Sequence, residues 1–298
     1  LKIKLMSRIE VLKTYKIFIG GKFPRTESGR YYPLKHNNKI IANMCLSSVK
    51  DFRNAVVAAK AAHGSWAGKT TYNRSQILYR MAEVLEGRKA QFIAELEMQG
   101  ISSKNAVQEV ELSVDRLIYY AGWCDKYVQI HSSVNPVSGS FFNFSVPEPM
   151  GVVAVIAPED SGLLGLVTQI CSIIAGGNTC VVLASEKLPL CAVSFSEVIA
   201  TSDVPGGVVN IITGKASELI NNFASHMNVN AILYCGSDKK VIKNIQDLAI
   251  ENIKRVVIRE NSDYVDAKHD NLYYIFDFQE TKTTWHPIEQ IGGSGSGY

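Results

Sequence analysis

Several features are missing from this sequence, and each absence excludes a class of protein. The chain carries 31 basic and 28 acidic residues with the two signs interspersed, so no basic tract marks a nucleic-acid-binding surface. The longest apolar stretch, residues 162–175, is shorter than the roughly 20 residues that cross a bilayer, and Thr168 and Gln169 interrupt it. No internal repeat is present. We therefore expect neither nucleic acid nor a membrane among the partners.

Metal-binding and secretory patterns are also missing. The six histidines show no ligand spacing, and the charged residues Lys2, Lys4 and Arg8 leave no uncharged signal core. No zinc spacing and no C-x-x-C pair occurs among the six cysteines, which are Cys45, Cys124, Cys171, Cys180, Cys191 and Cys235. Unpaired cysteines are typical of a reducing compartment. The sequence predicts a cytoplasmic protein without a metal site.

The second half of the chain alternates short apolar runs with amphipathic segments. Strands are predicted at residues 152–157, 179–183, 208–212, 231–235 and 255–258. Between them, the hydrophobic spacing predicts helices over residues 163–175, 190–200, 216–225 and 237–252. Apolar, β-branched strands separated by helices are typical of a parallel sheet that is covered on both faces. The predicted fold is therefore a doubly wound, Rossmann-like α/β domain.

The first half is predicted to be mostly helical. Residues 15–19 and 22–24 form a strand-like pair, and Ser48 and Asp51 have the spacing of a capping box at the start of a helix. Two further helices are predicted from about Asn73 and over residues 103–125. After these helices, residues 127–146 are predicted as a long β-hairpin, and one more strand is predicted within residues 272–285.

Several short strings resemble the aldehyde dehydrogenase superfamily in their order and spacing. They lie at residues 15–24, 64–66, 147–153, 175–182, 184–186, 205–214 and 236–237. The resemblance covers nearly the whole chain and looks closest to the truncated, non-catalytic second unit of aldehyde dehydrogenase family sixteen. It implies the following parts: an N-terminal helical part of the cofactor-type domain (1–126), an oligomerisation hairpin (127–147), a Rossmann-like part (148–260), a linker with a C-terminal arm (261–291) and a flexible tail (292–298).

The resemblance also implies that the family's catalytic domain is absent, because its place falls between Glu260 and Leu272. The family's cysteine nucleophile belongs to that domain. The general-base glutamate of the family aligns with Arg259, and a guanidinium cannot accept a proton. Glu260 would face the opposite side of an extended segment. No residue of this chain is therefore assigned a catalytic role.

Two residues near the predicted cleft are better explained by structure than by chemistry. The family asparagine that donates to the oxyanion aligns with Asp160, whose carboxylate would repel that oxyanion. We expect Asp160 or Ser161 to cap the helix over residues 163–175 instead. Cys235 is the one cysteine near the cleft, and a buried position at the end of a strand is expected for it rather than a nucleophilic role.

The NAD(P) site that the resemblance implies is only partly kept. Glu186 matches a ribose contact, and Gly236 and Ser237 match the start of the turn that faces the pyrophosphate. Leu183 stands where the family has a ribose-binding lysine, and the Cβ of Val241 would crowd a phosphate. A tight strand-to-helix turn also explains the glycine. We expect no bound cofactor, with NAD or NADP at these vestigial residues as the alternative.

The parts that are kept concern assembly. The hairpin 127–147 carries Phe141, Phe142 and Phe144, and the lone arm 272–286 would need a sheet edge. We therefore predict a pseudoenzyme that pairs with itself, or with a full-length aldehyde dehydrogenase subunit, as an oligomerisation, scaffold or regulatory partner. Two alternatives stay open: an NAD(P)-binding regulatory module, and an aldehyde oxidoreductase that is active only with a partner subunit.

Overall fold

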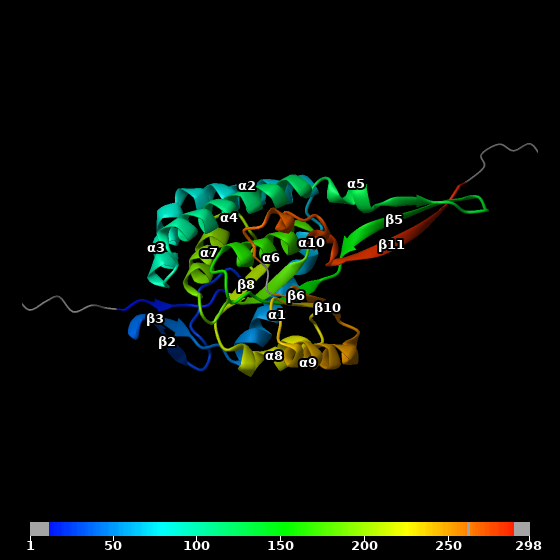
Figure 1. Cartoon of the computed structure of the whole chain (residues 1–298). Helices are drawn as coiled ribbons and strands as arrows, with labels where there is room; N and C mark the ends of the chain where they lie inside the picture. The colour runs from blue at the N-terminus through cyan, green and yellow to red at the C-terminus, as the bar shows by residue number, and fades with distance from the viewer. Residues whose placement is uncertain (1–11, 261–262, 289–298) are drawn as a thin grey trace, which may run out of the picture.

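A computed structural model describes residues 12–260 and 263–288, and a five-stranded parallel sheet lies at its centre (Figure 1). The strand order is β10-β9-β6-β7-β8, and all neighbours run parallel. The strands are β6 (Val152–Ile156), β7 (Thr179–Leu183), β8 (Val209–Ile212), β9 (Ala231–Tyr234) and β10 (Arg255–Ile258). Every residue of β6, β7 and β8 is buried, which is why these strands show no polar alternation. The predicted α/β fold is confirmed.

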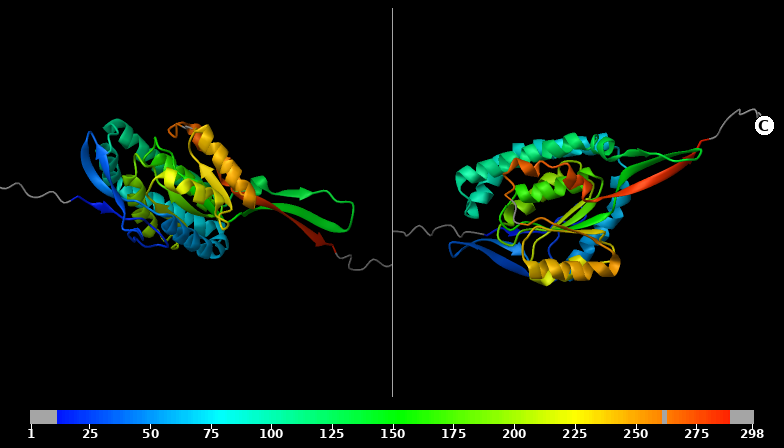
Figure 2. Two further views of the ribbon diagram at one scale, coloured as in Figure 1. Left: turned by 90° about the horizontal axis from the view of Figure 1, so that it is seen from below. Right: turned by 45° about the vertical axis from the view of Figure 1, so that its right-hand side comes forward.

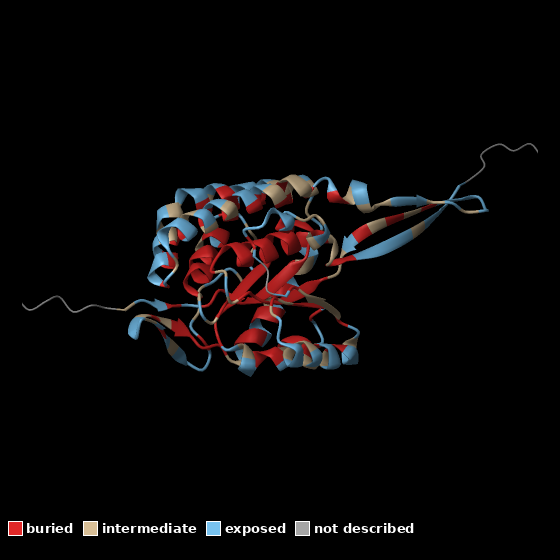
Figure 3. Ribbon diagram, viewed as in Figure 1, coloured by how far each residue is buried: buried red, intermediate tan, exposed pale blue. Residues whose placement is uncertain are grey.

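Helices cover both faces of this sheet (Figures 1 and 2). One face carries α6 (Leu164–Ala175) and α7 (Leu190–Ala200). The opposite face carries α1 (Val49–Ala67), α8 (Ala216–Ser225) and α9 (Lys239–Ala249). A further layer packs over the first face and consists of α2 (Thr71–Gly87), α3 (Lys89–Met98) and α4 (Ser103–Trp123). Because α6 lies between the sheet and this layer, all of its residues are buried (Figure 3).

The N-terminal region contains elements that the sequence pattern did not predict. The capping box is confirmed, since the Ser48 N–H donates to Asp51 Oδ2 at 2.7 Å and Ser48 Oγ accepts from the Asp51 N–H. In addition, β2 (Tyr31–His36) and β3 (Lys39–Cys45) form a hairpin, and β1 (Thr14–Tyr15) runs parallel to β3. Helix α3 was also not predicted.

A second, three-stranded sheet projects from the body of the protein (Figures 1 and 2). It consists of β4 (Ser133–Asn135), β5 (Phe141–Pro149) and β11 (Gln279–Pro287), in the order β11-β5-β4. The C-terminal arm is therefore not a lone strand, because β11 pairs antiparallel with β5 of the same chain along its whole length. The flexible tail that was predicted at 292–298 lies outside the described residues.

Two segments that were predicted as strands are helical. Residues 127–130 belong to α5 (Tyr127–His131), so the hairpin begins only at Ser133. The reason is packing: α5 continues the path of α4, which places the Tyr127 ring in the main core with 2% exposure. Likewise, α10 (Tyr273–Phe276) lies within the segment that was expected to be extended, and it buries Ile275 completely.

A short segment connects β10 to β11, where the family's catalytic domain was predicted to be missing. Its described residues, 259–260 and 263–278, hold a 3-10 turn, η2 (Ala267–His269), and α10. The buried Arg116 of α4 binds this segment by donating to the carbonyl oxygens of His269 (3.0 Å) and Tyr264 (3.2 Å) and pairing with Asp270. The described part of the segment therefore lies against the helical layer and forms no separate domain.

The two sheets are joined at Asn178, which is completely buried. Its Oδ1 accepts from the Gly151 N–H at 2.9 Å, just before β6, and its Nδ2 donates to the Phe278 carbonyl at 2.8 Å, just before β11. The remaining short element is the 3-10 turn η1 (Ile250–Asn252). Within the part of the chain that the structure describes, no helix combines the length and apolarity that a membrane crossing requires.

Candidate functional site

A cleft of about 570 Å³ lies at the carboxyl edge of the parallel sheet. This edge is where ligands bind in open α/β sheets. Glu186, Gly236 and Ser237, the three residues that the sequence predicted for a cofactor, all line the cleft, so the structure brings them together. The lining is completed by Ile156, Ala157, Glu159, Asp160, Lys187, Ala216, Tyr234, Cys235 and Asp238.

Glu159, in the loop after β6, occupies the turn that follows β7. Its carboxylate accepts from Ser185 Oγ at 2.9 Å, and from the backbone N–H groups of Glu186 and Lys187 at 3.1 Å each. This turn therefore directs its donors at a carboxylate of the same chain. The sequence reading missed Glu159, although its position at the end of a buried strand was an available signal.

Glu186 reaches the N-terminus of α8. Its carboxylate oxygen accepts from the Ala216 N–H at 2.5 Å, in the first turn of the helix. A carboxylate is stabilised there by the unsatisfied N–H groups and by the helix dipole. Leu183, at the position of the family's ribose-binding lysine, is buried in the core beneath α8 and contributes no polar group.

The turn at Gly236 and Ser237 leads into α9. A Cβ on Gly236 would lie 2.6 Å from the end of the Tyr234 side chain, which would have to move to make room. Asp238 caps the helix, because its carboxylate accepts from the N–H groups of Lys240 (2.8 Å) and Val241 (3.3 Å). Gly236 therefore lies in a short strand-to-helix turn beside the Tyr234 ring.

Cys235 is the cysteine nearest to the cleft, and it is buried. Burial raises the pKa of its thiol to about 11, although Arg259 and a hydrogen bond with Tyr264 act in the opposite direction. A thiol with this pKa is almost entirely protonated near neutral pH, and the thiolate is the nucleophilic form. The other five cysteines are also buried and unpaired.

Arg259, which the resemblance aligns with the family's general base, is held in a buried clamp. Its guanidinium donates to Gln169 Oε1 and to Asp277 Oδ2, the latter at 2.8 Å, and lies 3.6 Å from the centre of the Tyr274 ring. A clamped cation cannot activate a water molecule. Glu260, the next residue, is exposed, in agreement with the predicted change of face.

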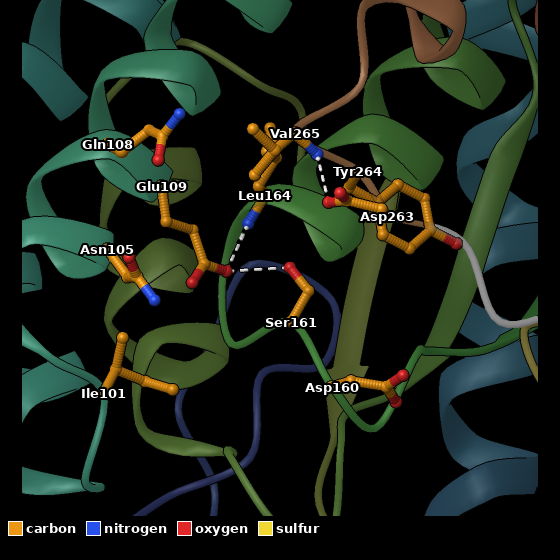
Figure 4. A pocket seen from close by; sticks show the side chains of 10 residues that line it. All are labelled: Ile101, Asn105, Gln108, Glu109, Asp160, Ser161, Leu164, Asp263, Tyr264 and Val265. Carbon is orange, nitrogen blue, oxygen red and sulfur yellow. Dashed lines mark hydrogen bonds between the residues drawn. The ribbon is translucent and has the colours of Figure 1, made fainter.

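A neighbouring cavity of about 510 Å³ lies between α4, the start of α6 and residues 263–265 (Figure 4). There the Glu109 carboxylate accepts from Ser161 Oγ (2.7 Å) and from the N–H groups of Leu163 and Leu164. Ser161 Oγ in turn accepts from the Gly165 N–H. The prediction that Asp160 or Ser161 caps this helix was wrong, because Leu163 is the N-cap of α6. Ser161 still binds the first turn through the Gly165 N–H, and Glu109, which the sequence analysis missed, supplies the negative charge there.

Among residues 12–260 and 263–288, no group of three His, Cys, Asp or Glu side chains is arranged to hold a metal ion. The polar groups of the cleft are four carboxylates, one lysine and the side chains of Tyr234, Cys235 and Ser237.

The parallel sheet and the cleft at its carboxyl edge define a Rossmann-like α/β protein. A sequence profile described as the aldehyde dehydrogenase family matches residues 26–260, and the chain belongs to this family. The match ends two residues after β10, where the short segment leading to β11 begins. The family that the motifs indicated is thereby confirmed.

The chain is similar to parts of longer proteins. The chain is 32% identical to a protein of Bacillus subtilis (strain 168) that carries the name aldehyde dehydrogenase DhaS. The similarity extends over 254 residues, which cover 82% of this chain and 50% of DhaS. Cytosolic 10-formyltetrahydrofolate dehydrogenase of Mus musculus is 28% identical over 85% of this chain and 29% of that protein. The NAD+ complex of an aldehyde dehydrogenase from Bacillus cereus has a TM-score of 0.79 at 26% identity, over 83% of this chain and 51% of that one. The chain therefore spans about half the length of these relatives, or less.

Proposed function

We propose that this chain is a non-catalytic member of the aldehyde dehydrogenase family that acts as an oligomerisation, scaffold or regulatory partner. It would pair with a second copy of itself or with a full-length aldehyde dehydrogenase subunit. The observation that carries the proposal is the projecting sheet, which presents apolar side chains and an open strand edge to solvent. The same proposal places the protein in the cytoplasm, where its six unpaired cysteines stay reduced.

The β4 and β5 strands of the projecting sheet carry an apolar cluster on one face, which we name the phenylalanine face and define by Val134, Phe142, Phe144 and Val146. On the same face β11 carries the polar residues Lys282, Thr284 and His286. Val134 is 69% exposed and Phe142 is 44% exposed. The two phenylalanine rings lie 5.5 Å apart, and the face lines a shallow groove of about 290 Å³. Clustered aromatic exposure of this kind is typical of an interaction surface.

The outer edge of the sheet is a second feature that supports a partner. Among residues 12–260 and 263–288, β11 has one hydrogen-bonded neighbour, β5, so its other edge presents backbone N–H and C=O groups. An exposed edge of this length pairs readily with a strand from another chain. The intramolecular pairing also fixes the edge in an extended conformation before any partner arrives.

Two features support the non-catalytic part of the proposal. Cys235, in the cleft, carries a protonated thiol near neutral pH, and Arg259, which the resemblance aligns with the family's general base, is a buried cation bound to Asp277. The alternative, an aldehyde oxidoreductase that works only with a partner subunit, would need both groups from that partner. We expect the purified chain to produce no NADH from NAD+ and an aldehyde, and measurable turnover would favour the alternative.

Light scattering coupled to size-exclusion chromatography tests the assembly. We expect the wild-type chain to run as a dimer or larger, and Phe142→Asp to run as a monomer because a carboxylate would be buried in the interface. Tyr72→Asp is the matched control: Tyr72 is an aromatic residue of α2 with 67% exposure, and this change should leave the mass unaltered.

A heteromeric assembly is tested by co-expression with a full-length aldehyde dehydrogenase from the same source. In that case the wild-type chain and Tyr72→Asp should co-purify with the longer subunit, and Phe142→Asp should not. A wild-type chain that is monomeric alone and also fails to co-purify would contradict the proposal.

A further inference from the structure

We propose that the cleft at the carboxyl edge of the parallel sheet is closed to nucleotide phosphates by the chain's own carboxylates. In this proposal Glu159 and Asp238 are built-in anions that occupy the donors a dinucleotide would use. The proposal concerns the cleft alone and is independent of the assembly through the projecting sheet.

A dinucleotide needs two kinds of partner in a cleft of this type. Its phosphates bind backbone N–H groups at a turn or at the N-terminus of a helix, where the dipole favours negative charge. Its ribose hydroxyls are held by an acidic side chain near the end of a neighbouring strand. Three groups of this cleft could serve as such partners: the turn after β7, the N-terminus of α9 and the carboxylate of Glu186.

The backbone N–H groups of the turn after β7 are not free to bind a phosphate. The N–H groups of Glu186 and Lys187 both donate to Glu159, and Ser185 Oγ donates to the same carboxylate. These backbone and hydroxyl donors of the turn are thus already bound, which leaves the Lys187 side chain as its remaining donor among the lining residues. An incoming anionic oxygen would have to displace a carboxylate that is covalently part of the chain and therefore always present.

The N-terminus of α9 is also occupied. Asp238 accepts from Lys240 and Val241, so the first donors of the helix already bind a negative charge. The space over Gly236, where a backbone could approach a pyrophosphate closely, is filled by the Tyr234 ring. A phosphate at this helix would meet a carboxylate in front of it and an aromatic ring beside it.

The acidic residue predicted to hold the ribose has another role. Glu186 directs its carboxylate to the Ala216 N–H at the start of α8, which fixes its orientation. The balance of charge in the lining agrees with this assignment, because Glu159, Asp160, Glu186 and Asp238 are opposed by Lys187 as the only cation among the lining residues. The residues of the cleft therefore do not fit an anionic dinucleotide.

Isothermal titration calorimetry of the full chain with NAD+ and with ADP tests the proposal. The wild-type chain should give no saturable heat at millimolar ligand. The double variant Glu159→Gln/Asp238→Ser removes both charges, while the glutamine keeps the shape of Glu159 and the serine still caps α9. We expect it to bind ADP at least about tenfold more tightly than the wild type.

Asp247→Asn is the matched control, because Asp247 is an exposed carboxylate of α9 that does not line the cleft. It should bind ADP no better than the wild type. It matches the change of net charge in Asp238→Ser alone, and it shows for the double variant what the loss of one charge away from the cleft does. Circular dichroism establishes that each variant is folded. If the double variant does not fold, the single variant Asp238→Ser is measured against the same control and should also bind ADP more tightly.

Two results would overturn the proposal. One is saturable binding of NAD+ to the wild-type chain with a submillimolar Kd. The other is a folded variant, double or single, that binds ADP no more tightly than Asp247→Asn. Neither result depends on the oligomeric state, so the calorimetry tests the cleft without testing the assembly through the phenylalanine face.

Discussion

The parallel sheet and the projecting sheet treat their polar and apolar groups in opposite ways. In the parallel sheet, β6, β7 and β8 are buried throughout, and the N–H groups at the carboxyl edge bind carboxylates of the same chain. In the projecting sheet, Phe142 and Trp285 face solvent and the outer edge of β11 has no strand beside it within the described residues. The difference is in what each region leaves available: the donors at the carboxyl edge are bound within the chain, whereas the projecting sheet exposes aromatic side chains and a strand edge.

The largest effect is expected for Arg259→Glu, which places the family's general-base residue back at its position. The new carboxylate would be buried beside Asp277 and would lose the contact with the Tyr274 ring. Because the substitution leaves an unpaired charge inside the clamp, we expect the free energy of unfolding to fall by about 3–5 kcal/mol. Urea denaturation measures this loss.

Arg259→Lys is the control for that change. It keeps the positive charge beside Asp277 but loses the planar stacking on Tyr274, so a smaller loss is expected. If Arg259→Glu unfolded at the same urea concentration as the wild type, or gained aldehyde-dependent NADH formation, the clamp would not be structural and the description of the cleft would be wrong.

A smaller effect is expected at the amino edge of the parallel sheet, where the buried charge is a cation. Lys254 Nζ donates to the carbonyl oxygens of His226 (2.8 Å) and Val229 (2.9 Å), and burial lowers its pKa from 10.5 to about 8. Between these two pKa values the unfolded chain binds the extra proton, so this group makes stability rise with pH there. The rise should reach at most about 3 kcal/mol.

Urea denaturation at about pH 7.5 and about pH 10 measures this contribution. Lys254→Met should lack the rise, whereas Lys243→Met, which removes an exposed lysine of α9, should keep it. Below the folded pKa both states hold the proton, so no contribution of Lys254 is expected between pH 6 and pH 7. Equal pH profiles for Lys254→Met and the wild type would show that this lysine is hydrated rather than buried.

The smallest effect on folding is expected for Trp285→Ala in the projecting sheet. Trp285 is 60% exposed, and its ring centroid lies 5.8 Å from that of Phe141. The loss of the Trp285 side chain should therefore change the free energy of unfolding of the monomer by no more than about 0.5 kcal/mol. Phe278→Ala, just before the same strand, removes a completely buried ring and should cost about 3–5 kcal/mol.

Denaturation of Trp285→Ala at low and high protein concentration sharpens the comparison between the two sheets. A loss that grows with concentration would place Trp285 in an interface between chains. A loss above about 1 kcal/mol that does not depend on concentration would show that the projecting sheet is part of the fold's own core.

Much of the fold could be predicted because its signals are local. The strands β6 to β10 are apolar and β-branched, and the capping box at Ser48 marks the start of α1. The hairpin of β2 and β3 had a signal that was overlooked, since Asn37 and Asn38 tolerate the positive φ values of 48° and 61° that its turn requires. In contrast, α5 was mistaken for a strand because the burial of Tyr127 against the core decides its conformation, and burial is not visible in the local pattern.

The candidate site was predictable only in part for the same reason. Glu186, Gly236 and Ser237 follow strands that flank β6, so their meeting at one edge follows from the topology. The hydrogen bonds that hold the side chains of the site in place do not follow from the topology. Glu109 meets Ser161 across 52 positions of the sequence, and Arg116 holds His269 across 153. Such pairs depend on how the layers pack, which a single sequence does not specify.

The side-chain amide of Asn178 is one of several links between the parallel sheet and the projecting sheet. One end of its side chain holds the backbone ahead of β6, and the other holds the backbone ahead of β11. Arg255 of β10 adds a second link, because its guanidinium donates to the carbonyl oxygens of Asp277 and Gln279. The start of β11 is therefore anchored to the α/β body at both the central strand and the edge strand, in addition to the direct chain connection from β5 to β6.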